Sequence, residues 1–258
     1  MKKLHRFLSV IKRRIYQWYY SLRYRSELKK LAEYKDKYKG KRCFVIGTGP
    51  SLTPEDLNAL ECEYTFASNG IFKFFDKTKF RPDFYTVCDR TYYSANRVNV
   101  DAVVAKKQKI YPLDFALNFG FNKECCYFLR PYYRSKHLKF RTNPMRAFEE
   151  GSTVTYHLLQ LAAMMGFSEI YLLGIDFNYS LHIDNKGNLI KDDKVKDYAY
   201  NDKAANYTIP NLEASYNAYC SAEEYCRLHN YEVRIFNATR GGKLEVFKRV
   251  SFDEVLAK

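Results

Sequence analysis

The chain has 258 residues, is 47% hydrophobic and carries a formal net charge of +14, which suits one full α/β domain with an appendage, or at most two small domains. The charge is concentrated in residues 1–40, which hold 13 of the 43 Lys and Arg against 3 of the 29 Asp and Glu. No recognised nucleic-acid-binding motif accompanies this charge, so we expect no nucleic-acid partner. The 7 cysteines include no CxxC pair, which indicates reduced thiols rather than a zinc site or a disulfide framework.

Residues 1–40 are predicted to form a basic helical arm, and residues 41–258 a separate domain. Apolar residues from Leu4 to Leu22 recur at steps of three and four, with Lys and Arg between them, which predicts an amphipathic helix. Because cations interrupt the apolar positions, we expect neither a signal peptide nor a membrane span, and a cytoplasmic protein. Residues 1–25 are expected to lie on the anionic inner face of the cytoplasmic membrane, or to dock on the core or on a second copy in a homo-oligomer.

A glycine-rich corner follows the first predicted strand, which covers residues 42–46. Its glycines let the backbone turn sharply and approach a ligand, and the corner leads into a helix over residues 54–60 with Thr53 as N-cap. Such a corner can present main-chain N–H groups and hydroxyls to a phosphate. It matches neither GxGxxG nor a P-loop, and a tight turn without a ligand is the alternative. The corner consists of Gly47, Thr48, Gly49, Pro50 and Ser51.

Further strands are predicted over residues 64–68, 84–88 and 170–175, and each runs into a polar side chain. Strands that alternate with helices predict a Rossmann-like α/β fold, with a mostly parallel sheet and helices on both faces. Ligands gather at the carboxyl ends of the strands in such sheets, so we expect the polar residues there to form one site. The expected group is Asn69, Asp89, Asp176, and Ser152 with Thr153 at the start of a helix.

The remaining segments are predicted from composition. Residues 105–150 are expected to be an irregular insertion beside the site, with strands over 110–113 and near 127–129, and the polar, tyrosine-rich residues 178–210 a lid. Arg240, which precedes two glycines after the last predicted strand, is a candidate clamp for an anion, with an ordinary turn as the alternative. His157 is interpreted as a packing residue on its helix or as a side chain that makes a hydrogen bond along the helix face.

The ordered motifs resemble two related families. They are residues 46–52, Asn69, residues 151–153 and residues 169–177. The set is similar to the bacterial sialyltransferases of glycosyltransferase family 42, which use CMP-sialic acid. It is more similar to domains like 6-hydroxymethylpterin diphosphokinase that occur with surface-polysaccharide genes, because that likeness continues through residues 237–247. The resemblance covers nearly everything after Gly40.

The resemblance implies a glycosyltransferase of bacterial cell-surface glycan synthesis, such as lipopolysaccharide or capsule. Its donor would be a nucleotide sugar, with CMP-sialic acid or a related CMP-sugar favoured, and its acceptor a carbohydrate or a lipid-linked glycan. No metal and no cofactor are expected, because the leaving group of a CMP donor is a monophosphate. The implied nucleotide-binding residues are Gly47, Thr48, Gly49, Pro50, Ser51, Asn69, Asp89, Ser152, Thr153, Asp176, Phe177 and Asn178.

The chain departs from the sialyltransferase pattern at the catalytic base. The lid histidine of those enzymes has no counterpart here, so the candidate bases are His182, Tyr198 and Asp202. Two alternatives stay open. One is an ATP-dependent diphosphotransferase that acts on a pterin alcohol, with Mg²⁺ held by Asp89 and Asp176. The other is a non-catalytic, membrane-associated scaffold of a glycan assembly complex.

Overall fold

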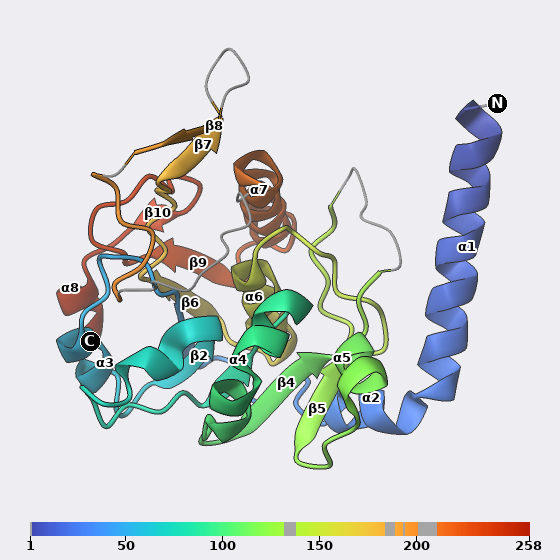
Figure 1. Cartoon of the computed structure of the whole chain (residues 1–258), viewed down its shortest axis with the longest axis horizontal. Helices are drawn as coiled ribbons and strands as arrows, with labels where there is room; N and C mark the ends of the chain where they lie inside the picture. The colour runs from blue at the N-terminus through green and yellow to red at the C-terminus, as the bar shows by residue number, and fades with distance from the viewer. Residues whose placement is uncertain (1, 132–137, 184–188, 193, 201–210) are drawn as a thin grey trace.

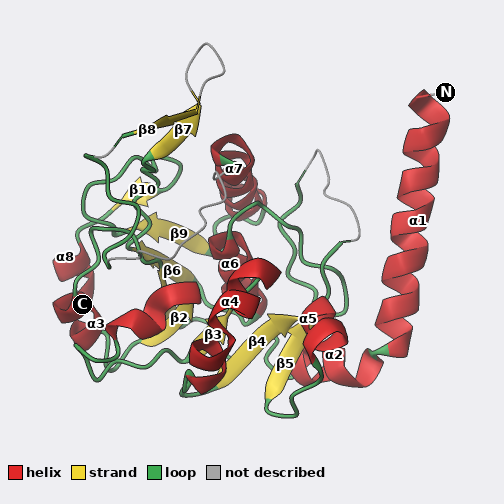
Figure 2. Cartoon of the chain, viewed as in Figure 1, coloured by secondary structure: helices red, strands yellow, loops and turns green. Residues whose placement is uncertain are grey.

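The computed structural model describes residues 2–131, 138–183, 189–192, 194–200 and 211–258. Its main sheet has 8 strands, and every pair of neighbours in it is parallel. These strands are β1 (Arg42–Ile46), β2 (Tyr64–Ser68), β3 (Phe84–Thr86), β4 (Gln108–Pro112), β5 (Cys125–Phe128), β6 (Glu169–Leu173), β9 (Arg234–Asn237) and β10 (Lys248–Arg249). They lie side by side in the order β10-β9-β6-β1-β2-β3-β4-β5 (Figures 1 and 2).

Helices surround this sheet, and a short antiparallel hairpin stands beside it (Figure 2). The helices are α1 (Lys2–Arg23), α2 (Arg25–Ala32), α3 (Pro54–Ala59), α4 (Arg90–Ala102), α5 (Leu113–Phe119), α6 (Val154–Met164), α7 (Leu212–Leu228), α8 (Phe252–Leu256) and the 3-10 helix η1 (Asn69–Phe74). The hairpin consists of β7 (Leu181–Ile183) and β8 (Leu189–Lys191).

Both faces of the sheet are covered, as the alternation along β1 shows. Cys43 and Val45 pack into a core with the side chains of α6 and α7. Phe44 and Ile46 point to the opposite face and pack with side chains of α3, α4, α5 and α8. Because both faces are buried, the strands read as continuous apolar runs, and the prediction of a doubly covered parallel α/β sheet is confirmed.

The predicted boundaries of β1 and β2 agree with the structure, and α3 begins as its sequence indicates. The Thr53 hydroxyl accepts from the Asp56 amide at 3.2 Å, and the Asp56 carboxylate accepts from the Thr53 amide at 3.0 Å. This reciprocal capping box satisfies two of the amides that a helix start leaves without partners.

Two expectations from the sequence need correction. Residues 105–150 were expected to be an irregular insertion with strands over 110–113 and near 127–129. β4 and β5 confirm the two strands, but together with α5 they extend the main sheet and form no irregular insertion. These strands are short, and a proline ends β4, so their sequence gave only a weak pattern. The helix α4, which begins after Asp89, was also missed.

α1 projects away from the sheet at one side of the molecule (Figure 1). Its last turn and the residue after it contact the body: the Ser21 hydroxyl donates to the Met145 carbonyl at 3.3 Å, and the Tyr24 ring stacks on Phe121 with ring centroids 5.8 Å apart. The following helix α2 belongs to the body, because Leu28 and Leu31 are fully buried. In the part of the chain that the structure describes, no helix is both long and apolar enough to cross a membrane.

Candidate functional site

A cavity of 1120 Å³ lies at the carboxyl ends of β1 to β6. Its walls also include the start of α6, the hairpin through Leu181 and α1 through Tyr16 and Tyr20. The topology therefore brings together polar residues that are far apart in the sequence. The predicted residues that line it are Gly47, Thr48, Gly49, Asn69, Asp89, Ser152, Thr153, Asp176, Phe177, Asn178 and Tyr198.

The glycine corner packs tightly against the loop after β6. The Gly47 and Gly49 amides donate to main-chain carbonyls of that loop region at 2.8 and 2.9 Å. The Ser51 amide and hydroxyl donate to the Asp176 carboxylate at 3.2 and 2.8 Å. A Cβ on Gly49 would overlap this carboxylate and lie 2.8 Å from the Gly174 carbonyl oxygen. The glycines thus allow close contact between two loops. The amides of Gly47, Gly49 and Ser51 already donate within the protein, so they do not form the phosphate-binding turn that we predicted.

The carboxylate of Asp176 occupies the place where we expected an anion. Burial raises its pKa, while the hydrogen bonds from the Ser51 hydroxyl and amide act in the opposite direction. A phosphate at this corner would be repelled by the carboxylate. Sugar hydroxyls, which donate hydrogen bonds, suit this position better.

Three residues other than glycine that line the cavity have left-handed backbone conformations. They are Asn69 with φ +46°, Ser152 with φ +58° and Phe177 with φ +51°. Each such residue stores on the order of 1–3 kcal/mol of backbone strain, which persists only where the surrounding structure enforces it. Their clustering around one cavity supports a functional role for it.

Two side chains of the cavity lining have buried polar atoms without hydrogen-bond partners among the described residues. These atoms are Oδ1 of Asn69 and both ring nitrogens of His157. Burial, assisted by the Arg130 cation, lowers the pKa of His157 to about 3, and a weak contact with the Thr153 carbonyl opposes this. The ring is therefore neutral at pH 7. Buried polar groups of this kind suit a ligand that supplies the missing partners.

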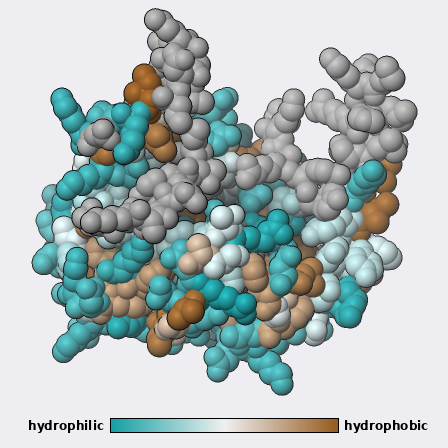
Figure 3. Space-filling view, viewed as in Figure 1, coloured by the Kyte–Doolittle hydropathy of each residue, from teal (hydrophilic) through white to brown (hydrophobic). Residues whose placement is uncertain are grey.

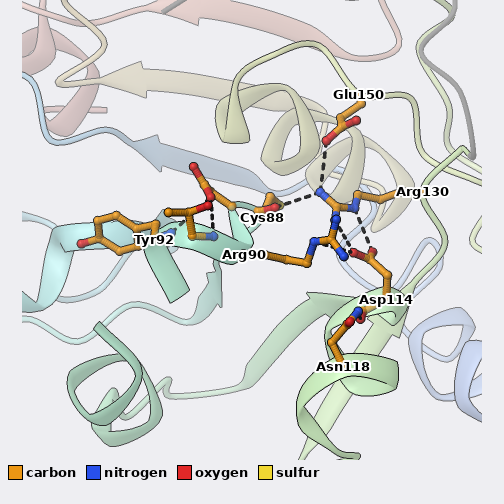
Figure 4. A network of polar contacts seen from close by, with 9 residues as sticks. Cys88, Arg90, Tyr92, Asp114, Asn118, Arg130 and Glu150 are labelled. Carbon is orange, nitrogen blue, oxygen red and sulfur yellow. Dashed lines mark hydrogen bonds and ion pairs between the residues drawn. The ribbon is translucent and has the colours of Figure 1, made fainter. Parts of the chain in front are cut away.

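An ion-pair network joins the ends of several strands at the other side of the cavity (Figure 4). The guanidinium of Arg130 donates to Asp114, with an Nε–Oδ1 distance of 2.9 Å, to Glu150 at 3.1 Å and to the Cys88 carbonyl at 2.8 Å. The Arg90 guanidinium lies 3.9 Å from Asp114. Arg130 is thus neutralised by carboxylates, while Arg90 is exposed at the cavity.

Several predicted binding residues have structural partners instead. The Asp89 carboxylate caps α4, accepting from the amides of Thr91 at 2.7 Å and Tyr92 at 3.1 Å. Arg240 does not line the cavity, and its guanidinium donates to Asp56 at 2.7 Å. Contrary to our prediction, Arg240 therefore pairs with Asp56 and does not hold an anion in this cavity. Pro50 and Ser51 also lie outside the lining, although Ser51 contacts it through Asp176.

The predicted catalytic bases are only partly described. The Tyr198 ring lines the cavity and stacks on Tyr200, with centroids 5.2 Å apart. His182 lies on β7, but its side chain is outside the described part, as is the whole of Asp202. Beside Tyr198, the Asp197 carboxylate accepts from the Ser180 amide and hydroxyl, both at 2.6 Å.

Besides Arg90, Asp114 and Glu150 of the ion-pair network, the sequence analysis missed two contributions to the cavity. One is His157, and the other is the pair Tyr16 and Tyr20 on α1. The spacing of the tyrosines places them one helical turn apart, which was a usable signal. Within the described residues, no group of three His, Cys, Asp or Glu side chains is placed to hold a metal ion.

Residues 17–181 match the family described as 6-hydroxymethylpterin diphosphokinase MptE-like. The chain belongs to this family. No curated protein matches it. The structure of the MAf glycosyltransferase from Magnetospirillum magneticum AMB-1 is similar to this MptE-like chain, with a TM-score of 0.54 and 17% identity over 88% of this chain. The likeness covers 38% of the MAf protein, so this chain spans well under half its length, and it shows a common fold.

The MptE-like match includes most of the cavity. The glycine corner, Asn69, His157 and Asp176 all fall within residues 17–181. His182, Tyr198 and Asp202 lie beyond it. The family match therefore covers the strand ends that line the cavity. The catalytic roles predicted for His182, Tyr198 and Asp202 stay predictions.

Proposed function

We propose that this MptE-like protein is a glycosyltransferase that transfers a sugar from a nucleotide-sugar donor, preferably a CMP-sugar, to a hydroxyl of a glycan. The observation that carries the proposal is the cavity at the ends of the parallel strands, where polar atoms of Asn69 and His157 have no hydrogen-bond partner among the described residues. Such atoms suit the hydrogen-bonding groups of a base, ribose or sugar. The MAf protein, whose fold is similar, is described as a glycosyltransferase, which supports the same class.

The charges of the cavity favour a donor with one phosphate. Its described lining includes the two cations Arg90 and Arg130, and carboxylates outnumber them. Arg130 is already paired with Asp114 and Glu150, so Arg90 is the cation most open to a phosphate. A diphosphate carries more negative charge and needs more compensation in such a place. The size of 1120 Å³ leaves room for a nucleoside and an attached sugar.

In this proposal Asp176 accepts the proton of the acceptor hydroxyl. That oxygen forms a bond to the anomeric carbon of the sugar, and the bond from this carbon to the phosphate oxygen breaks, so that CMP leaves with the electron pair. Burial raises the pKa of Asp176, which makes it a stronger base than an ordinary carboxylate. His157, with its lowered pKa, is a poor base and serves as a hydrogen-bonding group. Contributions from His182, Tyr198 or Asp202 stay open.

The family description favours a second candidate, diphosphoryl transfer from ATP to a pterin alcohol. That chemistry needs Mg²⁺ held near the phosphates. The described residues do not fit such a site, because the Asp89 carboxylate caps α4 and no group of three His, Cys, Asp or Glu side chains among them is placed to hold a metal ion. We therefore derive no step through Mg²⁺ and place this activity second.

Release of the nucleotide tests the proposal. The full-length protein is incubated with CMP-sialic acid, UDP-sugars or GDP-sugars and a mixture of glycan acceptors, and separately with ATP, Mg²⁺ and 6-hydroxymethylpterin. We expect CMP release, its loss in Asp176→Asn, and wild-type rates in Asp253→Asn, an exposed matched control outside the cavity. AMP formation that depends on the pterin would establish the second candidate. Nucleotide binding without turnover of any donor would point to a scaffold.

A further inference from the structure

α1 has two sides with different surroundings. Tyr16 and Tyr20 line the cavity, and their ring centroids are 4.3 Å apart. Other apolar side chains of the same helix are exposed, with Trp18 at 66% and Tyr19 at 52%. Figure 3 shows hydrophobic side chains on the outer part of this helix. Among the side chains of α1 that the structure describes, the large exposed apolar ones are Ile15, Trp18, Tyr19 and Leu22.

The charge of α1 indicates what covers this exposed side. Its sequence contains Lys and Arg but no Asp or Glu. A second copy of this chain, with a net charge of +14, would bring surfaces of the same sign together. An anionic lipid surface has the complementary charge, and Trp and Tyr side chains favour the boundary between headgroups and acyl chains.

We propose that α1 binds the surface of an anionic membrane through Ile15, Trp18, Tyr19 and Leu22, and that Tyr16 and Tyr20 place the cavity beside that surface. The helix lies in the interface rather than crossing it, since its cations interrupt the apolar positions. In Figure 1, α1 stands at the right edge and the β7–β8 hairpin at the upper left, and both point toward the top of the view. Both line the cavity, α1 through its tyrosines and the hairpin through Leu181.

This arrangement also restricts the acceptor, a step that rests on the proposed function. A cavity with one wall formed by a membrane-bound helix receives an acceptor from the lipid surface. The inference therefore assigns the acceptor to the lipid-linked glycans rather than to free sugars in solution. Membrane binding itself requires no catalysis, so it is tested independently of the proposed glycosyltransferase activity.

Vesicle co-sedimentation tests the proposal on the full-length protein. Vesicles of phosphatidylcholine alone are compared with vesicles of phosphatidylcholine and phosphatidylglycerol in equal parts. We expect binding to the anionic vesicles only, release at high salt, and at least a tenfold loss of binding in the double variant Trp18→Glu, Tyr19→Glu. The matched control is Val98→Glu on α4, a change at a side chain that is 83% exposed outside the cavity, and it keeps wild-type binding.

Circular dichroism and the melting temperature establish that each variant is folded. Equal sedimentation of the double variant and the wild type, or equal binding to neutral and anionic vesicles, would overturn the proposal. Light scattering without lipid measures the oligomeric state. If the wild type is a dimer and the double variant a monomer, this side of α1 binds a second copy of the chain instead of a membrane. Nucleotide binding in solution is unchanged in the double variant, so a failure here differs from a failure of the proposed function.

Discussion

Replacing His157 by leucine is expected to increase the stability of the free protein and to weaken ligand binding. The ring is 1% exposed and packs on Phe128, with ring centroids 5.2 Å apart, and neither nitrogen has a hydrogen-bond partner among the described residues. A buried polar group without a partner is destabilising by about 1–3 kcal/mol. Because the Thr153 carbonyl compensates in part, we expect a gain of about 1–2 kcal/mol, which raises Tm by a few degrees.

The pH dependence gives this prediction a second signature. The pKa of His157 is lowered from 6.5 to about 3 in the folded protein, so between these values the unfolded chain binds a proton that the folded protein does not. The wild type therefore loses stability as the pH falls through this window, by up to about 1.4 kcal/mol per pH unit. His157→Leu lacks this loss, and its advantage grows from pH 7 to pH 5.

Urea unfolding at both pH values, followed by thermal unfolding with and without CMP, measures both effects. CMP is expected to stabilise the wild type but not His157→Leu. His229→Leu is the matched control, because this exposed ring bonds the Tyr225 carbonyl at 2.9 Å and its loss brings no gain. A lower stability of His157→Leu at pH 7 without ligand would refute the reasoning, since it would mean that the ring has a partner within the protein.

Two further substitutions test the walls of the cavity by urea unfolding. Arg130→Leu removes the cation that Asp114 and Glu150 share and should lower the free energy of unfolding by about 1.5–3 kcal/mol, whereas Arg90→Leu, at an exposed pair, should lower it by less than about 1 kcal/mol. Equal effects would contradict the network. Gly49→Ala places a methyl group on the Asp176 carboxylate and should lower the free energy of unfolding by about 1–3 kcal/mol; an unchanged value would show that the two loops are not in contact.

The sequence predicted those parts of the fold that local chemistry determines. Residues 42–46 and 64–68 are continuous apolar runs with clear ends, and the Thr53 capping box requires only neighbouring residues. β3 was predicted over 84–88 and ends at residue 86, and the helix after it begins beside Asp89, which we interpreted as a strand end. The Asp89 carboxylate caps this helix, so an Asp that follows a strand was a local signal that we assigned to the ligand site instead.

The sequence predicted where in the sheet the site lies but not which residues contact one another there. The glycines at 47 and 49 indicated a close approach, and the structure shows that the approaching group is the loop after β6 with Asp176. Sequence alone does not show which loop meets the corner. His157 was read as packing because α6 is buried on nearly all sides, so periodicity does not mark the side that faces the cavity.

Titration calorimetry of CMP with the full-length protein, without metal, tests the central claim most directly. The account predicts saturable binding at one site, weakened at least tenfold in His157→Leu and unchanged in His229→Leu. Absence of heat with CMP while ATP and Mg²⁺ bind, or equal affinity of CMP for the wild type and His157→Leu, would contradict the assignment of this cavity to a CMP-sugar donor.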